Sequence, residues 1–434
     1  MTRLSPAERA RQATAKSKPQ RALPQRGGQK QAKKTVSRAP NFRDVAAGGG
    51  AKFQVFFDRA FKAQSIHFYR LLGVTLFLVA FGMVMVLSAS SIDSLVANNN
   101  SLTIFLKQVG AAILGLILMS IASVMPLSVY QKYARVFFAI TMFLQVLVLL
   151  VGKSVNGNKN WLMIGPVGIQ PSEFLKVSVI ILLAWFVHTK QTELEITMTW
   201  YKALGIAAAA MVLVITGKDL GTVIIMMITF VGLLMLAGMP NRLMVLIASG
   251  MVLLSPVLLT GSRMGRIMAW LNPNGPDPLN YNWQAEHGMW ALAAGRIFGS
   301  GLGESKMKWS WIPEVENDFI FAIVGEELGL IGALGVILLF VFLAFSLLRI
   351  MQRTQDEFSR LIVAGVLMWI VFQALVNIAV VLRLAPVLGV PLPLISSGGS
   401  SLLASLLALG VVLAIERDNN SRPAAVRKLS RSRR

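Results

Sequence analysis

Five carboxylates crowd into one short stretch of a sequence that otherwise carries few acids. The stretch runs from 309 to 329, and its acidic residues are Glu314, Glu316, Asp318, Glu326 and Glu327. Burial and neighbouring negative charge both keep a carboxyl group protonated to higher pH, which suits a general base that works near neutrality. We take Asp318 as the candidate base and Glu314 as a supporting group.

Asp318 has a second interpretation, because Asn317 and Asp318 directly precede an apolar run. A residue at that point can cap the helix by accepting hydrogen bonds from its first free N–H groups. The helix dipole would then lower the pKa of Asp318 and make it a poorer base. The sequence leaves both roles open.

Three charged residues stand at the starts of two other apolar segments. Glu173 and Lys176 are three residues apart, so they share a helical face and can neutralise one another, and Asp219 opens a later segment. Placing a charged group inside the membrane costs free energy, so such residues are functional-site candidates by default. The alternative is a structural ion pair that orients helices.

Several cations and hydroxyls could receive an anionic ligand. Arg263, Arg266, Lys306 and Lys308 lie in one long loop, and Ser396 and Ser397 lie in a stretch rich in small residues before the last apolar segment. A helix amino terminus there could bind a phosphate. Small residues also let helices pack closely in lipid, which is the competing explanation of that stretch.

The composition indicates which kind of structural element positions these residues. Of 434 residues, 55% are hydrophobic and only 14% are charged, which is too apolar for a soluble domain. Ten segments approach the roughly 20 residues needed to cross a bilayer. They run over 70–90, 104–125, 134–152, 173–189, 202–217, 219–238, 242–261, 319–349, 360–383 and 394–416. We predict an all-α polytopic membrane protein, in which the long loop 262–318 separates spans seven and eight on the extracytoplasmic side.

The basic residues gather in two tails, and their positions predict how the chain is oriented in the membrane. Of 42 Lys and Arg, 16 lie in residues 1–70 and seven in 417–434. Tails of this kind attract anionic lipid head groups at the cytoplasmic face, so we expect both termini there and no nucleic-acid partner. Residues 1–51 are predicted to be disordered, and 417–434 to form a basic cytoplasmic tail. Residues 52–69 fit an amphipathic interfacial helix or an extension of the first span.

The chain has no cysteine, and its three histidines are dispersed at 67, 188 and 287. Disulfides, thiolate catalysis and iron–sulfur clusters are therefore excluded, and no zinc or haem site is expected.

Five motifs together resemble the SEDS family, the polymerases of bacterial shape, elongation, division and sporulation. They are QPSEFLK at 170–176, KDLGT at 218–222, GSGLGES at 299–305, WIPEVENDFIFAIVGEELG at 311–329 and PLPLISSGGSS at 391–401. The resemblance covers roughly residues 70–416, and the division branch looks closer than the elongation branch.

The resemblance implies ten membrane helices, residues 70–416, and a peptidoglycan glycosyltransferase that polymerises lipid II. It implies a class B penicillin-binding transpeptidase as partner, alongside other cell-division proteins and membrane lipids, in septal cell-wall synthesis at the bacterial cytoplasmic membrane. The family's essential aspartate falls on Asp318, its helix-four pair on Glu173 and Lys176, and its helix-six carboxylate on Asp219. The loop cations are candidates for the departing pyrophosphate. A divalent cation there, Mg or Mn, has no evident ligand cluster, and no other cofactor is expected.

Four positions depart from the family pattern. Asn160 stands where arginine is usual, Lys218 where proline is common and Asn317 where threonine is usual, and the tyrosine–glutamine pair is shifted in 281–284. These departures bear on how the loops hold sugars.

Two competing functions stay open: a lipid II flippase would also need intramembrane charges, and a scaffold would recruit division proteins through the basic tails.

Overall fold

The computed structural model describes residues 64–155, 158–165, 167–193, 197–258, 261–277, 279–309 and 311–421. All of them belong to one compact unit, Phe56–Arg434. The predicted tail 1–51, the part of the predicted interfacial helix before residue 64, and residues 422–434 lie outside the described residues. The last helix continues to Ser421, five residues into the segment predicted as a tail.

The described part of the chain is mostly helical, and eight of its helices are long and apolar enough to cross a membrane. The prediction of an all-α polytopic membrane protein is confirmed. The eight are α3 (Ile66–Ala89), α5 (Thr103–Val124), α6 (Leu127–Val151), α7 (Pro171–Thr189), α8 (Thr197–Thr216), α13 (Ile320–Arg353), α14 (Glu357–Val381) and α15 (Gly399–Ser421).

The other two predicted spans also form helices, α9 (Leu220–Leu236) and α10 (Asn241–Leu258), but neither is among those eight. At 1.5 Å per residue, the 17 residues of α9 span only about 26 Å. Its inner face is buried against α14 and its neighbours α7 and α8. The element is therefore an apolar helix at the predicted place, shorter than predicted.

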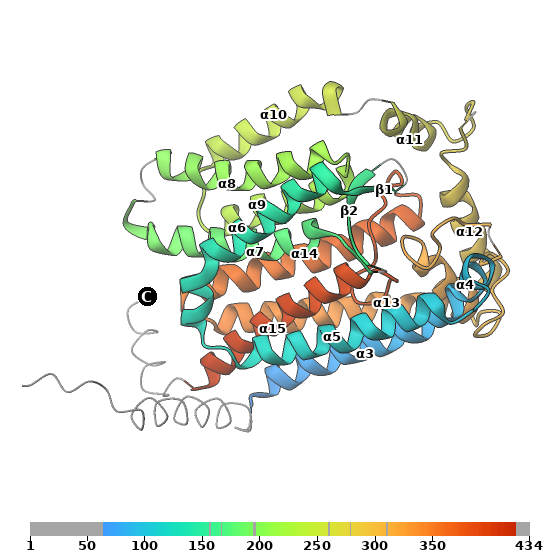
Figure 1. Cartoon of the computed structure of the whole chain (residues 1–434), viewed down its shortest axis with the longest axis horizontal. Coiled ribbons are helices and arrows are strands. Elements are labelled where there is room, and N and C mark those ends of the chain that lie inside the picture. Colours follow the sequence, from blue (N-terminus) through green and yellow to red (C-terminus); the bar gives the residue numbers. More distant parts are fainter. Residues whose placement is uncertain are drawn as a thin grey trace, which may run out of the picture. The chain divides into compact units, whose positions relative to one another are not determined.

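Helices α7, α14 and α15 form the core of the bundle (Figure 1). In their most apolar windows 72%, 67% and 83% of residues are buried, against 22% for α5 and α6. Helix α5 packs closely along α15. A Cβ added at Gly410 would lie only 2.6 Å from the Met119 carbonyl oxygen, which shows how near the two backbones approach. Small residues at such crossings supply the packing that lipid does not drive.

One end of the bundle carries most of the irregular structure, and we call it the loop end. Here lie α4 (Ser91–Asn98), α11 (Ser262–Leu271), α12 (Trp283–Gly295) and a small antiparallel sheet (Figure 1). Its strands, in the order β1-β2-β3, are β1 (Lys153–Val155), β2 (Asn158–Ile164) and β3 (Val167–Ile169). A short 3-10 turn, Gln191–Glu193, follows α7.

Between α14 and α15 the chain makes a loop that packs inside the bundle. Leu394 and Ile395 are buried, and a Cβ at Gly82 of α3 would lie 2.7 Å from the Cα of Ile395. Irregular backbone of this kind is tolerated in membrane proteins where protein surrounds it. Helix α15 therefore begins at Gly399, five residues after the predicted start of the last span.

Helix α13 is broken at Gly329, which has φ +67° and ψ −166°. The break leaves backbone groups that residues 296–301 satisfy: Ser300 N donates to Glu326 O at 2.9 Å and Gly301 N to Glu327 O at 3.0 Å, while Leu330 N donates to Arg296 O at 2.9 Å. The loop before the acidic stretch is thus paired, backbone to backbone, with the helix after it. This pairing fixes the first segment of α13 at the loop end.

Candidate active site

An acidic cavity of about 640 Å³ opens at the loop end. Four carboxylates reach its wall, from α7, from the start of α9 and from the stretch before α13; they are Glu173, Asp219, Glu314 and Asp318. The rest of the wall includes Asn158, Asn160, Trp161, Gln170, Thr222, Arg266, Gln284, Pro313, Asn317, Ser397 and residues 387–389. Segments far apart in sequence therefore place carboxylates around one space. Their hydrogen-bond partners distinguish them.

Asp318 has a half-buried side chain, and its Oδ1 has neither accessible surface nor a hydrogen-bond partner. Glu173 Oε2 on the same wall also lacks a partner, although Glu173 is paired with Lys176 through Oε1. Desolvation by burial, reinforced by the charges of Glu314 and Asp219, raises the pKa of Asp318 to about 7, against a lowering effect of Arg266. A carboxyl group with that pKa can accept a proton near neutral pH.

The helix-cap interpretation of Asp318 finds no support in the geometry. The N-cap of α13 is Phe319, whose side chain makes no capping hydrogen bond, so the helix begins two residues after Asp318. The carboxylate of Asp318 faces the cavity wall, where a Cβ at Gly389 would lie 3.4 Å from its Oδ2.

The backbone around Asp318 is held from two sides. Asn377 of α14 donates through Nδ2 to the carbonyl oxygens of Asp318 and Val390, both at 2.7 Å. On the other side, Asp318 N donates to Glu314 O at 3.1 Å. Asn377 ties the acidic stretch to the loop after α14 and was not singled out in the sequence, where it reads as one polar residue in an apolar span.

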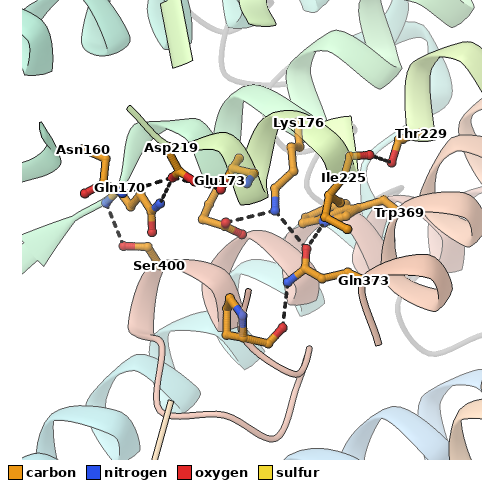
Figure 2. A network of polar contacts seen from close by, with 12 residues as sticks. Asn160, Gln170, Glu173, Lys176, Asp219, Ile225, Thr229, Trp369, Gln373 and Ser400 are labelled. Carbon is orange, nitrogen blue, oxygen red and sulfur yellow. Dashed lines mark hydrogen bonds and ion pairs between the residues drawn. The ribbon is translucent and has the colours of Figure 1, made fainter. Parts of the chain in front are cut away.

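Asp219 contrasts with Asp318, because its carboxylate is fully engaged (Figure 2). It caps α9 by accepting from Thr222 N at 3.0 Å, and it also accepts from Thr222 Oγ1 at 2.9 Å. Asn160 Nδ2 and Gln170 Nε2 donate to it at 3.0 and 3.1 Å. These four hydrogen bonds hold the Asp219 carboxylate in place on the cavity wall.

Glu173 and Lys176 form the ion pair that their spacing predicts, with Lys176 Nζ 2.9 Å from Glu173 Oε1 (Figure 2). Lys176 is buried, bonds Gln373 Oε1 at 3.0 Å and lies 4.6 Å from the centre of the Trp369 ring. Gln373 in turn donates to Pro391 O at 3.0 Å. The pair links α7, α14 and the loop before α15, with Glu173 on the cavity wall and Lys176 behind it.

A second, basic cavity of about 400 Å³ adjoins the first. Its cations are Lys218, Arg263 and Arg266, and it shares Asn158, Arg266, Val387 and Leu388 with the acidic cavity. Lys218 has φ +66°, a conformation that residues with a side chain rarely adopt. Arg263 and Arg266 were predicted to hold an anion and Lys218 was not, because its place between α8 and α9 gave no sign that it would meet α11.

The remaining predicted residues divide between the cavity wall and the surrounding structure. Ser397 lines the acidic cavity, whereas Ser396 is buried and its Oγ accepts from Leu392 N at 2.8 Å. Lys306 is exposed and lines neither cavity. Lys308 is buried 3.6 Å from Glu327 Oε1 and bonds the Gly303 carbonyl.

Glu326 and Glu327 anchor the glycine-rich loop to α13. Glu326 accepts from Ser305 Oγ at 2.5 Å and from Lys306 N at 2.8 Å. Glu327 accepts from Ser88 Oγ of α3 at 2.5 Å. Lys308 thus forms an ion pair with Glu327 and lines neither of the two cavities.

Among the described residues no group of three or more His, Cys, Asp or Glu is arranged to hold a metal ion. The carboxylate oxygens of Asp219 already accept hydrogen bonds from four donors. The described side chains therefore do not form a metal site of their own.

The sequence of residues 69–421 matches the model of the FtsW/RodA/SpoVE family, described as cell cycle proteins. That match spans most of the chain. The chain belongs to the FtsW/RodA/SpoVE family.

Relatives in this family are similar over most of their length. The "Probable peptidoglycan glycosyltransferase FtsW" of Mycobacterium tuberculosis is 36% identical over 365 residues, covering 83% of this chain and 70% of that protein. Stage V sporulation protein E of Bacillus subtilis is 36% identical over 351 residues, covering 79% and 95%.

Two solved structures share the fold. A chain from a structure titled "Structural coordination of polymerization and crosslinking by a peptidoglycan synthase complex" matches with TM-score 0.66 and 26% identity, covering 83% of this chain and 99% of that chain. The rod shape determining protein RodA of Thermus thermophilus matches with TM-score 0.61 and 24% identity, covering 84% and 99%.

Proposed function

We propose that this chain is a peptidoglycan glycosyltransferase that polymerises lipid II into glycan strands in septal cell-wall synthesis. Relatives at 33–36% identity carry the name peptidoglycan glycosyltransferase, which supports the activity. The observation that carries the chemical assignment is the state of Asp318: a carboxylate on the wall of a 640 Å³ cavity, with a pKa near 7 and one oxygen without a partner.

In the proposed reaction Asp318 takes the proton from the 4-hydroxyl of the acceptor GlcNAc. The oxygen attacks the anomeric carbon of the donor MurNAc and forms the new glycosidic bond with inversion. The bond from that carbon to the phosphate oxygen breaks, and undecaprenyl pyrophosphate leaves with the electron pair. A positioned base contributes about 10² to 10⁴ of the rate.

The basic cavity supplies what the leaving group needs. Lys218, Arg263 and Arg266 line one space, and Arg266 also lines the acidic cavity. Positive charge fixed beside the departing pyrophosphate stabilises the negative charge that develops on it. We therefore assign the donor pyrophosphate to the basic cavity and the acceptor sugar to the acidic one. No step is assigned to a divalent cation.

The chain is a multi-pass membrane protein, and its placement in the cell belongs to the proposal. We infer a bacterial cytoplasmic membrane location at the division septum, with both basic termini in the cytoplasm, where they meet anionic lipids, and the loop end outside. We also propose a class B penicillin-binding transpeptidase as partner, together with other division proteins. The structural neighbour's title, which couples polymerisation to crosslinking, supports a partner of this kind.

The test uses purified full-length chain, reconstituted in liposomes with its transpeptidase partner and labelled lipid II. We expect glycan strands longer than the disaccharide unit and release of undecaprenyl pyrophosphate. Transfer of intact lipid II across the bilayer without any polymer would favour a flippase. Neither product from a folded preparation would leave a scaffold as the better account.

A further inference from the structure

Three aromatic rings form a compact stack at the loop end, which we call the aromatic platform: Trp283, His287 and Trp311. The centres of the Trp283 and His287 rings are 3.9 Å apart. Trp311 lies nearly parallel to both, at 6.3 Å and 15° from Trp283 and at 5.7 Å and 16° from His287. The two indoles remain 38% and 51% exposed, although large apolar rings gain from burial.

Hydrogen bonds fix the platform in place. Trp283 Nε1 donates to Trp311 O at 2.6 Å, and His287, which is buried, bonds Trp283 O through Nδ1 at 2.8 Å. Because α12 and the acidic stretch each contribute an indole, these bonds tie the two segments together. The rings thus offer a preformed surface and lose little conformational freedom on binding.

The platform continues directly into the wall of the acidic cavity. Gln284, the residue after Trp283, donates through Nε2 to Pro313 O at 2.9 Å, and both residues line that cavity. Glu314, which follows, lies on the same wall. Trp283 is the chain neighbour of Gln284, and Trp311 is two residues from Pro313, so the platform adjoins this wall.

We propose that the aromatic platform is a saccharide subsite that holds the glycan strand beside the proposed active site. This inference rests on the proposed function. Pyranose rings present C–H groups on their flat faces, and the electron-rich face of an indole attracts such weakly positive groups. A strand held at its sugars can remain bound while its end returns to Asp318. The platform would therefore lengthen the product without taking part in the bond-forming step.

The test measures saccharide binding apart from catalysis. A lipid-free β-1,4-linked GlcNAc tetrasaccharide is titrated into the purified full-length chain carrying Asp318→Asn, so that no turnover interferes. Adding Trp311→Ala is expected to weaken binding about tenfold, the scale of one lost stacking contact. Trp311→Phe keeps a ring and should restore most of the affinity. The backbone carbonyl that Trp283 uses survives in both variants, and melting temperatures check the fold.

Trp309→Ala is the matched control, since this tryptophan is 62% exposed two residues away and has no ring contact within the described part of the chain. It should bind the tetrasaccharide normally. In an otherwise wild-type chain, Trp311→Ala should shorten the glycan strands several-fold.

Equal tetrasaccharide affinity in all variants would overturn the subsite, as would equal losses in Trp309→Ala and Trp311→Ala. Loss of transpeptidase co-purification, or of binding to anionic vesicles, with saccharide affinity intact would instead make the rings a protein or membrane surface. Absence of polymer from the wild-type chain would refute the proposed function and leave the binding result standing.

Discussion

At the residue scale, the four carboxylates of the acidic cavity differ in what their oxygens contact. Asp219 accepts four hydrogen bonds, and Glu173 is paired with Lys176. Asp318 Oδ1 has no partner, as is also true of Glu173 Oε2, and desolvation by burial raises the pKa of Asp318 to about 7. This raised pKa suits Asp318 to the role of proton acceptor that we propose for it.

The first prediction concerns pH. Only ionised Asp318 can accept a proton, so kcat/KM for lipid II should rise with pH and reach half its maximum at about 7. Glu314→Gln removes a charge that raises this pKa and should shift the acid limb to lower pH, whereas Arg266→Gln should shift it to higher pH. Profiles measured from pH 5 to 9 check this, and an acid limb that neither variant moves would contradict it.

Some contacts of this site could be predicted from the sequence, and others could not, for physical reasons. The pairing of Glu173 with Lys176 follows from helical spacing alone. The choice between base and cap for Asp318 depends on which residue starts α13, and that boundary is not readable from Asn317 and Asp318 themselves. The ion pair of Lys308 with Glu327 could not be predicted from spacing, because the two residues meet only after the chain folds back onto α13.

At the element scale, the sequence predicted α13 as an unbroken span, whereas the structure breaks this helix at Gly329. Gly299 and Gly329 face one another, and a Cβ on Gly299 would lie 2.1 Å from Glu327 O. Gly299 opens the GSGLGES motif at 299–305, and it forms a close contact that lets residues 296–301 complete the hydrogen bonding of a broken helix.

Gly299→Ala should accordingly destabilise the protein, by about 1–3 kcal/mol from the φ of +83° alone and more from the clash. Thermal melting in detergent measures it. Gly303→Ala is the matched control, because its φ is +85° but nothing lies within 4 Å of the added Cβ. Equal melting temperatures for the two variants would show that the contact between the loop and α13 contributes little.

Helix α14 makes a separate prediction through Asn377. Asn377→Ala removes two 2.7 Å bonds, to the carbonyls of Asp318 and Val390, so the base should lose its alignment. We expect kcat to fall at least tenfold with KM for lipid II little changed. Asn419→Ala, which removes a comparably buried amide from the far end of α15, should lower stability and leave kcat intact. Similar kcat in both variants would argue against positioning.

At the scale of the whole molecule, the two ends of the bundle have separate tasks. Far from the loop end, buried Glu416 of α15 accepts from Ser65 Oγ at 2.5 Å and lies 3.5 Å from Arg353 of α13, so it joins three helices. Glu416→Gln should cost about 1–3 kcal/mol of stability through groups left unsatisfied. Its kcat at a temperature where it stays folded should match wild type, and a loss of kcat would show that the ends are coupled.

The general architecture was the most predictable feature, because hydropathy alone reports helices that lipid surrounds. Each of the ten predicted segments contains a helix. What hydropathy could not report is the irregular backbone inside the bundle, the break at Gly329 and the buried loop around Ile395. Both bear on the site, since they bring the acidic stretch and the loop before α15 together.

The most direct test of the central claim compares wild type with Asp318→Asn in lipid II polymerisation, with melting curves recorded from pH 6 to 8. We predict a loss of about 10² to 10⁴ in rate. Because the pKa of folded Asp318 lies above its unfolded value of about 3.9, ionising it costs stability as pH rises from about 4 to 7. The inactive variant should therefore melt at least as high as wild type at pH 8. A folded Asp318→Asn protein that polymerises at the wild-type rate would contradict the account.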